Sequence, residues 1–134
     1  MAEASRIDSP SSGFAQKKVV SMHELGIVFS IIRDIEEAAR ENEVEHVDIV
    51  RLRIGEVSAI VPHYLEDCWK WAVQRTERMK GCSVEIETIP AVTWCDSCRQ
   101  TYETIPHGKI CPYCGSGETW LKQGNECVIQ EIVV

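Results

Sequence analysis

Two Cys-x-x-Cys pairs constrain the fold of this chain more than any other feature of its sequence. The four cysteines are Cys95, Cys98, Cys111 and Cys114, with twelve residues between the two pairs. Each pair makes a tight turn that brings two thiolates to one point, so that two turns complete a tetrahedron of sulfur ligands. Pro112 and Gly115 provide turn chemistry at the second pair, whereas Arg99 stands at the glycine position of the first.

A tetrahedral set of four sulfurs predicts a zinc site. Zn²⁺ accepts four thiolates without a geometric demand of its own, and four protein ligands leave no open position, so the site is predicted to be structural. A rubredoxin-like iron centre, an iron–sulfur cluster and two disulfides are the alternatives. An odd total of seven cysteines argues against a simple disulfide framework. His107, between the pairs, is interpreted as an exposed loop residue, with an auxiliary metal contact as the alternative. The remaining cysteines are expected to be small buried hydrophobic residues; they are Cys68, Cys82 and Cys127.

Two segments have the apolar spacing of amphipathic helices. The first runs from about residue 22 to 41, and its apolar face consists of Leu25, Phe29, Ile32, Ile35 and Ala39. Pro62 can open the second helix at its first position, and Gly81 is expected to end it. The predicted inner stripe of this helix consists of Leu65, Cys68, Trp69, Ala72, Thr76 and Met79.

Three further segments alternate between apolar and polar residues, as strands do. In "HVDIVRLRIGEVSAI", the side chains of Val50, Leu52 and Ile54 share one face, and Gly55 is interpreted as a bulge. "SVEIETIPA" precedes the cysteine-rich segment, and "NECVIQEIVV" follows it. This order predicts an α+β fold, in which a three-stranded sheet covered by two helices carries an inserted zinc-ribbon-like module with four cysteine ligands. The predicted domain comprises residues 22–92 and 122–134, and the module comprises residues 93–121.

Charge and hydropathy narrow the class of partner. The net charge is −7, and no stripe of lysine and arginine suits a nucleic-acid backbone. No apolar run approaches the roughly 20 residues that span a bilayer, and no secretory signal opens the chain. We therefore expect a soluble protein without a membrane or nucleic-acid partner. Residues 1–21 show no sustained period and are predicted to be a flexible tail, either native or an extension added by cloning or by start-site choice.

The stretch "SMHE" at the start of the first helix has two interpretations. Ser21 and Glu24 match a capping box, in which the serine oxygen accepts the N–H of Glu24 and the glutamate reaches back to Ser21. Alternatively, a chain that begins at Met22 offers its amine, the amide nitrogens of His23 and Glu24, and an imidazole. Planar nitrogen ligands are those that Ni(II) and Cu(II) prefer. Spacing leaves both interpretations open.

The motifs taken together resemble those of the HypA/HybF hydrogenase nickel-incorporation proteins. The resemblance rests on "MHELGI", "RLRIGEVSAI", "CPYCGS" and "QGNECVIQEIVV", which occur in this order over residues 22–134. It implies a cytoplasmic metallochaperone that delivers nickel to the large subunit of [NiFe]-hydrogenase together with a GTPase accessory protein. It further implies that His23 carries the nickel with Glu24 close by, and that the four paired cysteines hold structural zinc. Such a protein would transfer metal rather than catalyse a reaction.

The 21-residue tail departs from the family pattern, because the Met-His-Glu triplet normally forms the N-terminus itself.

Two other classes of protein remain as alternatives. A zinc-ribbon protein that binds nucleic acid or a transcription complex would show tight, salt-sensitive binding. An enzyme that uses a Cys-x-x-Cys redox pair would have thiols that titrate in the native state. The sequence contains no GxxxxGK[ST], G-x-S-x-G or H-E-x-x-H motif.

Overall fold

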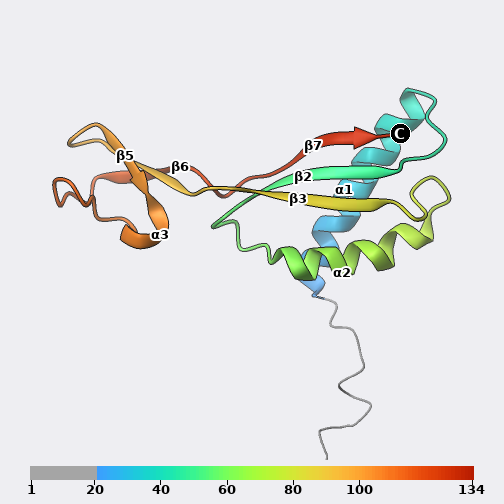
Figure 1. Cartoon of the computed structure of the whole chain (residues 1–134), viewed down its shortest axis with the longest axis horizontal. Helices are drawn as coiled ribbons and strands as arrows, with labels where there is room; N and C mark the ends of the chain where they lie inside the picture. The colour runs from blue at the N-terminus through green and yellow to red at the C-terminus, as the bar shows by residue number, and fades with distance from the viewer. Residues whose placement is uncertain (1–20) are drawn as a thin grey trace, which may run out of the picture.

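The structure, a computed structural model, describes residues 21–134 and contains two small three-stranded sheets (Figure 1). Of the predicted tail, only Ser21 lies within the described residues. The elements follow the order α1 (Met22–Glu41), β2 (Ile49–Gly55), α2 (Pro62–Ala72), the 3-10 turn η2 (Val73–Arg75), β3 (Ser83–Ile89), β4 (Val92–Cys95), β5 (Gln100–Glu103), α3 (Thr104–His107), β6 (Thr119–Gln123) and β7 (Cys127–Val133).

The first sheet has the strand order β3-β2-β7, with β2 parallel to β3 and antiparallel to β7. Parallel neighbours need a crossover connection, which α2 provides between β2 and β3. Val50, Leu52 and Ile54 of β2 are at most 2% exposed and share one core with residues of both helices. The predicted α+β order, the alternation of this strand and its cover of two helices are therefore confirmed.

The first helix has the predicted bounds, and Asn42 caps its C-terminus. Its buried stripe differs from the predicted one, because Phe29 is 44% exposed. The ring of Phe29 lies at the margin of the helix pair, where it packs edge-on against Trp71 with 6.0 Å between ring centroids. Val28, at 0% exposure, takes the core position instead. Neither α1 nor any other helix within residues 21–134 is long and apolar enough to cross a membrane.

The second helix ends earlier than its apolar stripe predicts. It stops at Ala72 and continues as a 3-10 turn, after which Thr76 is extended. The Thr76 hydroxyl donates to Glu36 of α1 (2.6 Å) and accepts the N–H of Met79 (3.0 Å). These bonds tie the connection to α1, so Met79 is buried from a loop rather than from a helix. The prediction of one helix up to Gly81 is wrong for this reason.

The outer face of the first sheet carries paired charges. The guanidinium of Arg51 donates to Glu85 through Nε (2.7 Å) and to Glu131 through Nη1 (2.6 Å). Arg53 lies 3.2 Å from Glu87. Because the two arginines of β2 are engaged by carboxylates on neighbouring strands, this face offers no free basic stripe to a phosphate backbone.

The second sheet, of strand order β5-β4-β6, is antiparallel and contains the cysteine-rich segment. It spans residues 92–123, slightly more than the module predicted at residues 93–121. Its three strands are four or five residues long and were not predicted individually. Figure 1 shows this sheet at one end of the molecule and the helices with the first sheet at the other.

The chain passes between the sheets at a point of very close backbone contact. A Cβ on Gly55 would lie 2.0 Å from the carbonyl oxygen of Gly124, and a Cβ on Gly124 would lie 2.5 Å from Cα of Ala91. The N–H of Gly55 donates to the carbonyl of Glu126 (2.7 Å), and that of Val57 donates to Gly124 (2.8 Å). Because Gly55 has no Cβ, the backbone of Gly124 can approach it this closely.

The bulge that was predicted at Gly55 is wrongly placed. The irregular register in the β2–β7 pair lies between Arg51 and Leu52. Gly55 ends β2 in regular register with Ile89 on β3. A glycine inside an apolar strand pattern indicates either a bulge or a close approach, and the sequence alone does not separate the two.

Replacing Gly55 by alanine should destabilise the protein strongly. The new methyl group would overlap backbone atoms of Gly124 and Asn125, which cannot move as a flexible side chain does. We expect a loss of about 3 kcal/mol in the free energy of unfolding, measured by urea denaturation. The matched control is Gly26→Ala in α1, which meets nothing within 4 Å and should gain roughly 0.5–1 kcal/mol. Equal stability of the two variants would contradict the close backbone approach at Gly55.

Candidate metal centres

The four paired cysteines meet at one point in the second sheet. Their Sγ atoms all lie within 4.8 Å of one another, and the cluster consists of Cys95, Cys98, Cys111 and Cys114. Two of the Sγ–Sγ distances, Cys95 to Cys114 and Cys98 to Cys111, are 3.6 Å. A tetrahedron of sulfurs with Zn–S bonds of about 2.3 Å has edges of about 3.8 Å. The residues therefore form a metal-binding site whose size and donors fit zinc.

The two turns that present the cysteines have the same backbone conformation. The N–H of Arg99 donates to the carbonyl of Cys95 (2.8 Å), and that of Gly115 donates to Cys111 (2.9 Å). Arg99 and Gly115 both have positive φ, 61° and 75°. The expected left-handed glycine is thus found after the second pair. Arg99 adopts the same conformation despite the steric cost of its Cβ, which is about 1 kcal/mol.

Backbone donors favour the thiolate form at the second turn. Burial raises the pKa of Cys111, but N–H groups of Cys114 and Tyr113 directed at its sulfur lower the pKa to about 7. The N–H of Tyr113 lies 3.4 Å from this Sγ. The thiolate is the species that binds a metal ion, so the turn prepares Cys111 as a ligand.

The remaining cysteines and His107 lie outside this cluster. Cys68 and Cys82 are buried in the helical core, as predicted, whereas Cys127 is exposed. Cys127 pairs with Ile54 at the start of β7, an outer strand of the first sheet that the helices do not fully cover. His107 ends α3 and packs edge-on against Tyr102, with 6.0 Å between ring centroids.

The first turn of α1 places His23 and Glu24 in opposite environments. The His23 side chain is 59% exposed, whereas that of Glu24 is only 3% exposed. Oε2 of Glu24 accepts the N–H of Val61 (2.9 Å) and lies 3.6 Å from Nδ1 of His23. Val61 is the N-cap of α2, so this carboxylate joins the N-terminal ends of the two helices. Sequence reasoning did not identify Val61, because the residue participates through its backbone.

The capping-box interpretation is wrong. Ser21 is the N-cap of α1, but its side chain makes no capping hydrogen bond. Burial raises the pKa of the Glu24 carboxyl, but the Ser21 hydroxyl and the Val61 N–H outweigh it and hold the pKa below its ordinary value. The first helical backbone bond runs from the N–H of Leu25 to the carbonyl of Ser21 (2.8 Å). The amides of His23 and Glu24 therefore make no backbone hydrogen bond within the helix, although the N–H of Glu24 is directed at its own carboxylate.

Comparison with known proteins identifies the family. The model for "Hydrogenase/urease nickel incorporation, metallochaperone, hypA" matches residues 22–134. The chain belongs to this HypA family. The hydrogenase maturation factor HypA 1 of Bradyrhizobium diazoefficiens is 32% identical over 113 residues, which cover 84% of this chain and 99% of that protein. HypA of Albidiferax ferrireducens is 33% identical over 116 residues, with the same coverage.

Solved structures of HypA proteins have the same fold. The solution structure of the nickel metallochaperone HypA from Helicobacter pylori has a TM-score of 0.63 at 22% identity and covers 82% of this chain and 95% of that one. A second HypA solution structure has a TM-score of 0.66 at 24% identity and covers 84% and 96%. The family match confirms the resemblance seen in the sequence, and these structures confirm the fold.

The buried Glu24 carboxylate should make stability depend on pH. Because its pKa is lowered on folding from 4.5, its contribution is fully present above about pH 4.5 and is lost as the pH falls through the folded pKa. Glu24→Ala leaves the Val61 N–H unsatisfied and should cost about 2–3 kcal/mol at pH 7. Glu24→Gln should cost less and flatten the acid limb of unfolding curves measured from pH 7 to pH 3. Glu37→Gln, which alters another glutamate of the same helix, is the control and should match the unmodified protein throughout.

The metal site predicts how many thiols react with a disulfide reagent. In the zinc-loaded chain only the exposed Cys127 should react rapidly, because bound thiolates are protected and Cys68 and Cys82 are buried. Removing the metal with a chelator should release the four cluster thiols in addition, and denaturant should then release all seven cysteines. Cys127→Ser serves as the control that removes the first rapid thiol alone. Rapid reaction of the cluster thiols before chelation would contradict the site.

Proposed function

We propose that this chain delivers nickel for the maturation of [NiFe]-hydrogenase, with His23 as a nickel ligand. The observation that carries the proposal is the first turn of α1, where an exposed imidazole adjoins two amides that make no backbone hydrogen bond within the helix. Nitrogen donors of this kind suit Ni(II), which favours planar coordination. Membership of a nickel-incorporation family supports the same cargo.

Glu24 contributes to the nickel site through position and charge. Its carboxylate is held by the Val61 N–H and lies 3.6 Å from Nδ1 of His23. A negative charge next to the imidazole favours a cation there. The Met22 amine is a further ligand if residues 1–21 are absent from the working protein. The family match begins at Met22.

The four-cysteine cluster holds structural zinc in this proposal. Four thiolates satisfy the tetrahedral demand and leave no position at which cargo could exchange. When bound, zinc supplies folding energy to the second sheet, whose buried apolar set besides the ligands is limited to Tyr102. The two proposed sites thus differ in donor type: sulfur atoms bind the resident zinc, and nitrogen atoms bind the nickel that is delivered.

Binding and transfer, rather than catalysis, define the proposed activity. Delivery requires a recipient, the hydrogenase large subunit, and a GTPase accessory protein as partners in the cytoplasm. Maturation of hydrogenase is the function named for the similar Bradyrhizobium protein. The nucleic-acid alternative is not favoured, because Arg51 and Arg53 are paired with glutamates.

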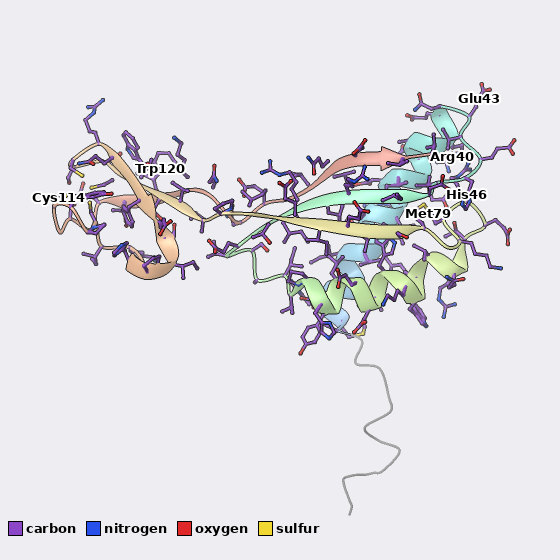
Figure 2. The ribbon with its side chains drawn as sticks, viewed as in Figure 1. Arg40, Glu43, His46, Met79, Cys114 and Trp120 are labelled. Atoms are coloured by element: carbon purple, nitrogen blue, oxygen red, sulfur yellow. The ribbon has the colours of Figure 1, made fainter. Side chains whose placement is uncertain are left out.

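Nickel titration of zinc-loaded protein tests the site directly. We expect tight binding by a chain that starts at Met22, and a loss of at least about tenfold in affinity for His23→Ala, measured by calorimetry. The full chain of 134 residues should bind more weakly, because Ser21 replaces the terminal amine. His46→Ala is the matched control, since His46 is also exposed but lies beyond the opposite end of α1 (Figure 2).

Two outcomes of this titration are decisive for the ligand set. Equal binding by both chains, each dependent on His23, would show that the imidazole and internal amides suffice without the amine. Nickel binding that survives His23→Ala but fails when the zinc cluster is disrupted would contradict the site at α1.

A further inference from the structure

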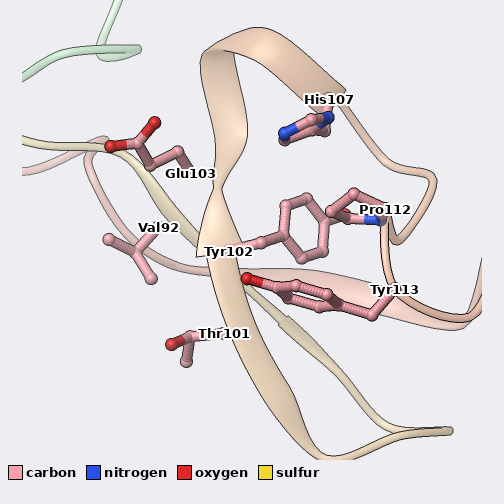
Figure 3. A pocket seen from close by; sticks show the side chains of 7 residues that line it. All are labelled: Val92, Thr101, Tyr102, Glu103, His107, Pro112 and Tyr113. Carbon is pink, nitrogen blue, oxygen red and sulfur yellow. The ribbon is translucent and has the colours of Figure 1, made fainter.

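A surface pocket of about 470 Å³ lies beside β5 in the second sheet and adjoins the second metal-binding turn. Its two sides differ in chemistry, as Figure 3 shows. Aromatic rings of Tyr102, Tyr113 and His107 form one side. Val92, Thr101 and Glu103 form the other. The β5 strand runs between the two sides, so a ligand in this pocket meets both surfaces and the strand itself.

The strand at this pocket has an open edge. β5 is the outer strand in the order β5-β4-β6, so one row of its N–H and C=O groups has no strand partner among residues 21–134. The N–H of Thr104 donates to Ala91 (3.1 Å), and the inward bonds of an antiparallel pair alternate along a strand. Thr101, which lines the pocket, therefore directs both its N–H and its C=O outward. Glu103 directs its N–H outward, whereas its C=O, at the N-cap of α3, accepts the first backbone bond of that helix.

The aromatic side is preformed. The hydroxyl of Tyr102 donates to the carbonyl of Gly108 (2.9 Å), which fixes the ring while leaving only 5% of the residue exposed. Tyr113 is 61% exposed and lies in the second metal-binding turn, between the ligands Cys111 and Cys114. Because that turn is held by the four-cysteine cluster, the backbone of Tyr113 has a fixed position. Exposed aromatic rings with fixed backbones bind apolar and cationic side chains well.

Charge decides which ligand the other side accepts. Among residues 21–134, Glu103 is the only acidic residue that lines the pocket, and no lysine or arginine lines it. The whole chain carries a net charge of −7, which attracts a basic partner. Glu103 is exposed and forms no ion pair with another residue in the described part of the chain. An arginine or lysine of a ligand would find this carboxylate free.

We propose that β5 binds a basic, extended peptide segment of a partner protein by strand addition. The segment pairs with the outward N–H and C=O of Thr101 and with the N–H of Glu103. Successive side chains of an extended peptide point to opposite faces, so a basic side chain reaches Glu103 while its neighbours lie on Tyr102 and Tyr113. This docking surface is separate from His23, and its occupancy does not require nickel.

The probe is a fluorescein-labelled peptide of sequence RVRVRV, titrated into the zinc-loaded chain and followed by fluorescence anisotropy. We expect saturable binding that weakens about fivefold to tenfold in Glu103→Gln, because a charge-assisted hydrogen bond is lost. The matched control is Glu118→Gln, an exposed glutamate of the same segment that does not line the pocket; it should bind as the unmodified chain does. A peptide that is N-methylated at every residue has no N–H to donate to a strand edge and should not bind.

Amide chemical shifts locate the peptide independently. Binding at β5 should shift the resonances of residues 100–103, whereas shifts centred on β3 or β7 would place the peptide on the first sheet and overturn the proposal. The absence of saturable binding, equal weakening by Glu118→Gln, or equal binding of the N-methylated peptide would each overturn it as well. So would dimerisation of the chain through β5, seen by sedimentation. His23→Ala should leave peptide affinity unchanged. The peptide test can therefore contradict the docking surface without contradicting the nickel site, and the nickel titration can do the reverse.

Discussion

The arrangement of the two sheets depends on the close backbone approach of Gly55, Gly124 and Ala91. Because neither glycine has room for a Cβ, the end of β2 and the chain returning to β7 come near enough to exchange backbone hydrogen bonds. The second sheet is consequently attached to the first by paired backbone at the point where β3 leaves and β7 enters. The orientation of the cysteine cluster relative to the helical layer follows from that contact.

A second constraint acts where the two helices begin, and it comes from the parallel connection. The β2-α2-β3 crossover and α1 place both helices on one face of the sheet, with their N-terminal ends adjacent. Positive partial charge accumulates at helix N-termini, and the buried Glu24 carboxylate neutralises it there. The bond to the Val61 N–H fixes the first turn of α1 against α2 while leaving His23 in solvent. One buried side chain thus determines the position of an exposed one.

The sequence predicted what local periodicity and spacing control. The bounds of α1, the alternation of β2 and the convergence of the four cysteines follow from repeats of about 3.6, 2 and 3 residues within short windows. The end of α2 was missed because Thr76 and Met79 continue its apolar stripe, although a bond to Glu36 of α1 holds this segment as a loop. Phe29 was misassigned because its ring packs against Trp71 at the margin of the helix pair rather than in the core.

The features that the sequence did not predict depend on contacts between distant residues. Glu24 and Val61 are 37 positions apart, and the partner is a backbone N–H that almost any residue type provides. The strands β4, β5 and β6 are too short to show alternation, because cysteines and turn residues occupy much of the segment. The pocket beside β5 combines residues from β4, β5, α3 and the second metal-binding turn, and its composition has no signature in the sequence.

A site that retains its metal needs different ligands from a site that releases its metal. The two proposed sites differ in this way. Four thiolates enclose an ion completely, so exchange requires several bonds to break before another ligand can enter. His23 offers one imidazole at the surface, and Glu24 is already committed to Val61. An ion at α1 therefore keeps open positions at which a recipient's ligands can attach before the chain's own ligands leave. Stepwise exchange of this kind lowers the barrier to transfer without requiring weak binding. It also requires the thiolates to remain occupied, because a vacant sulfur cluster would compete for the cargo.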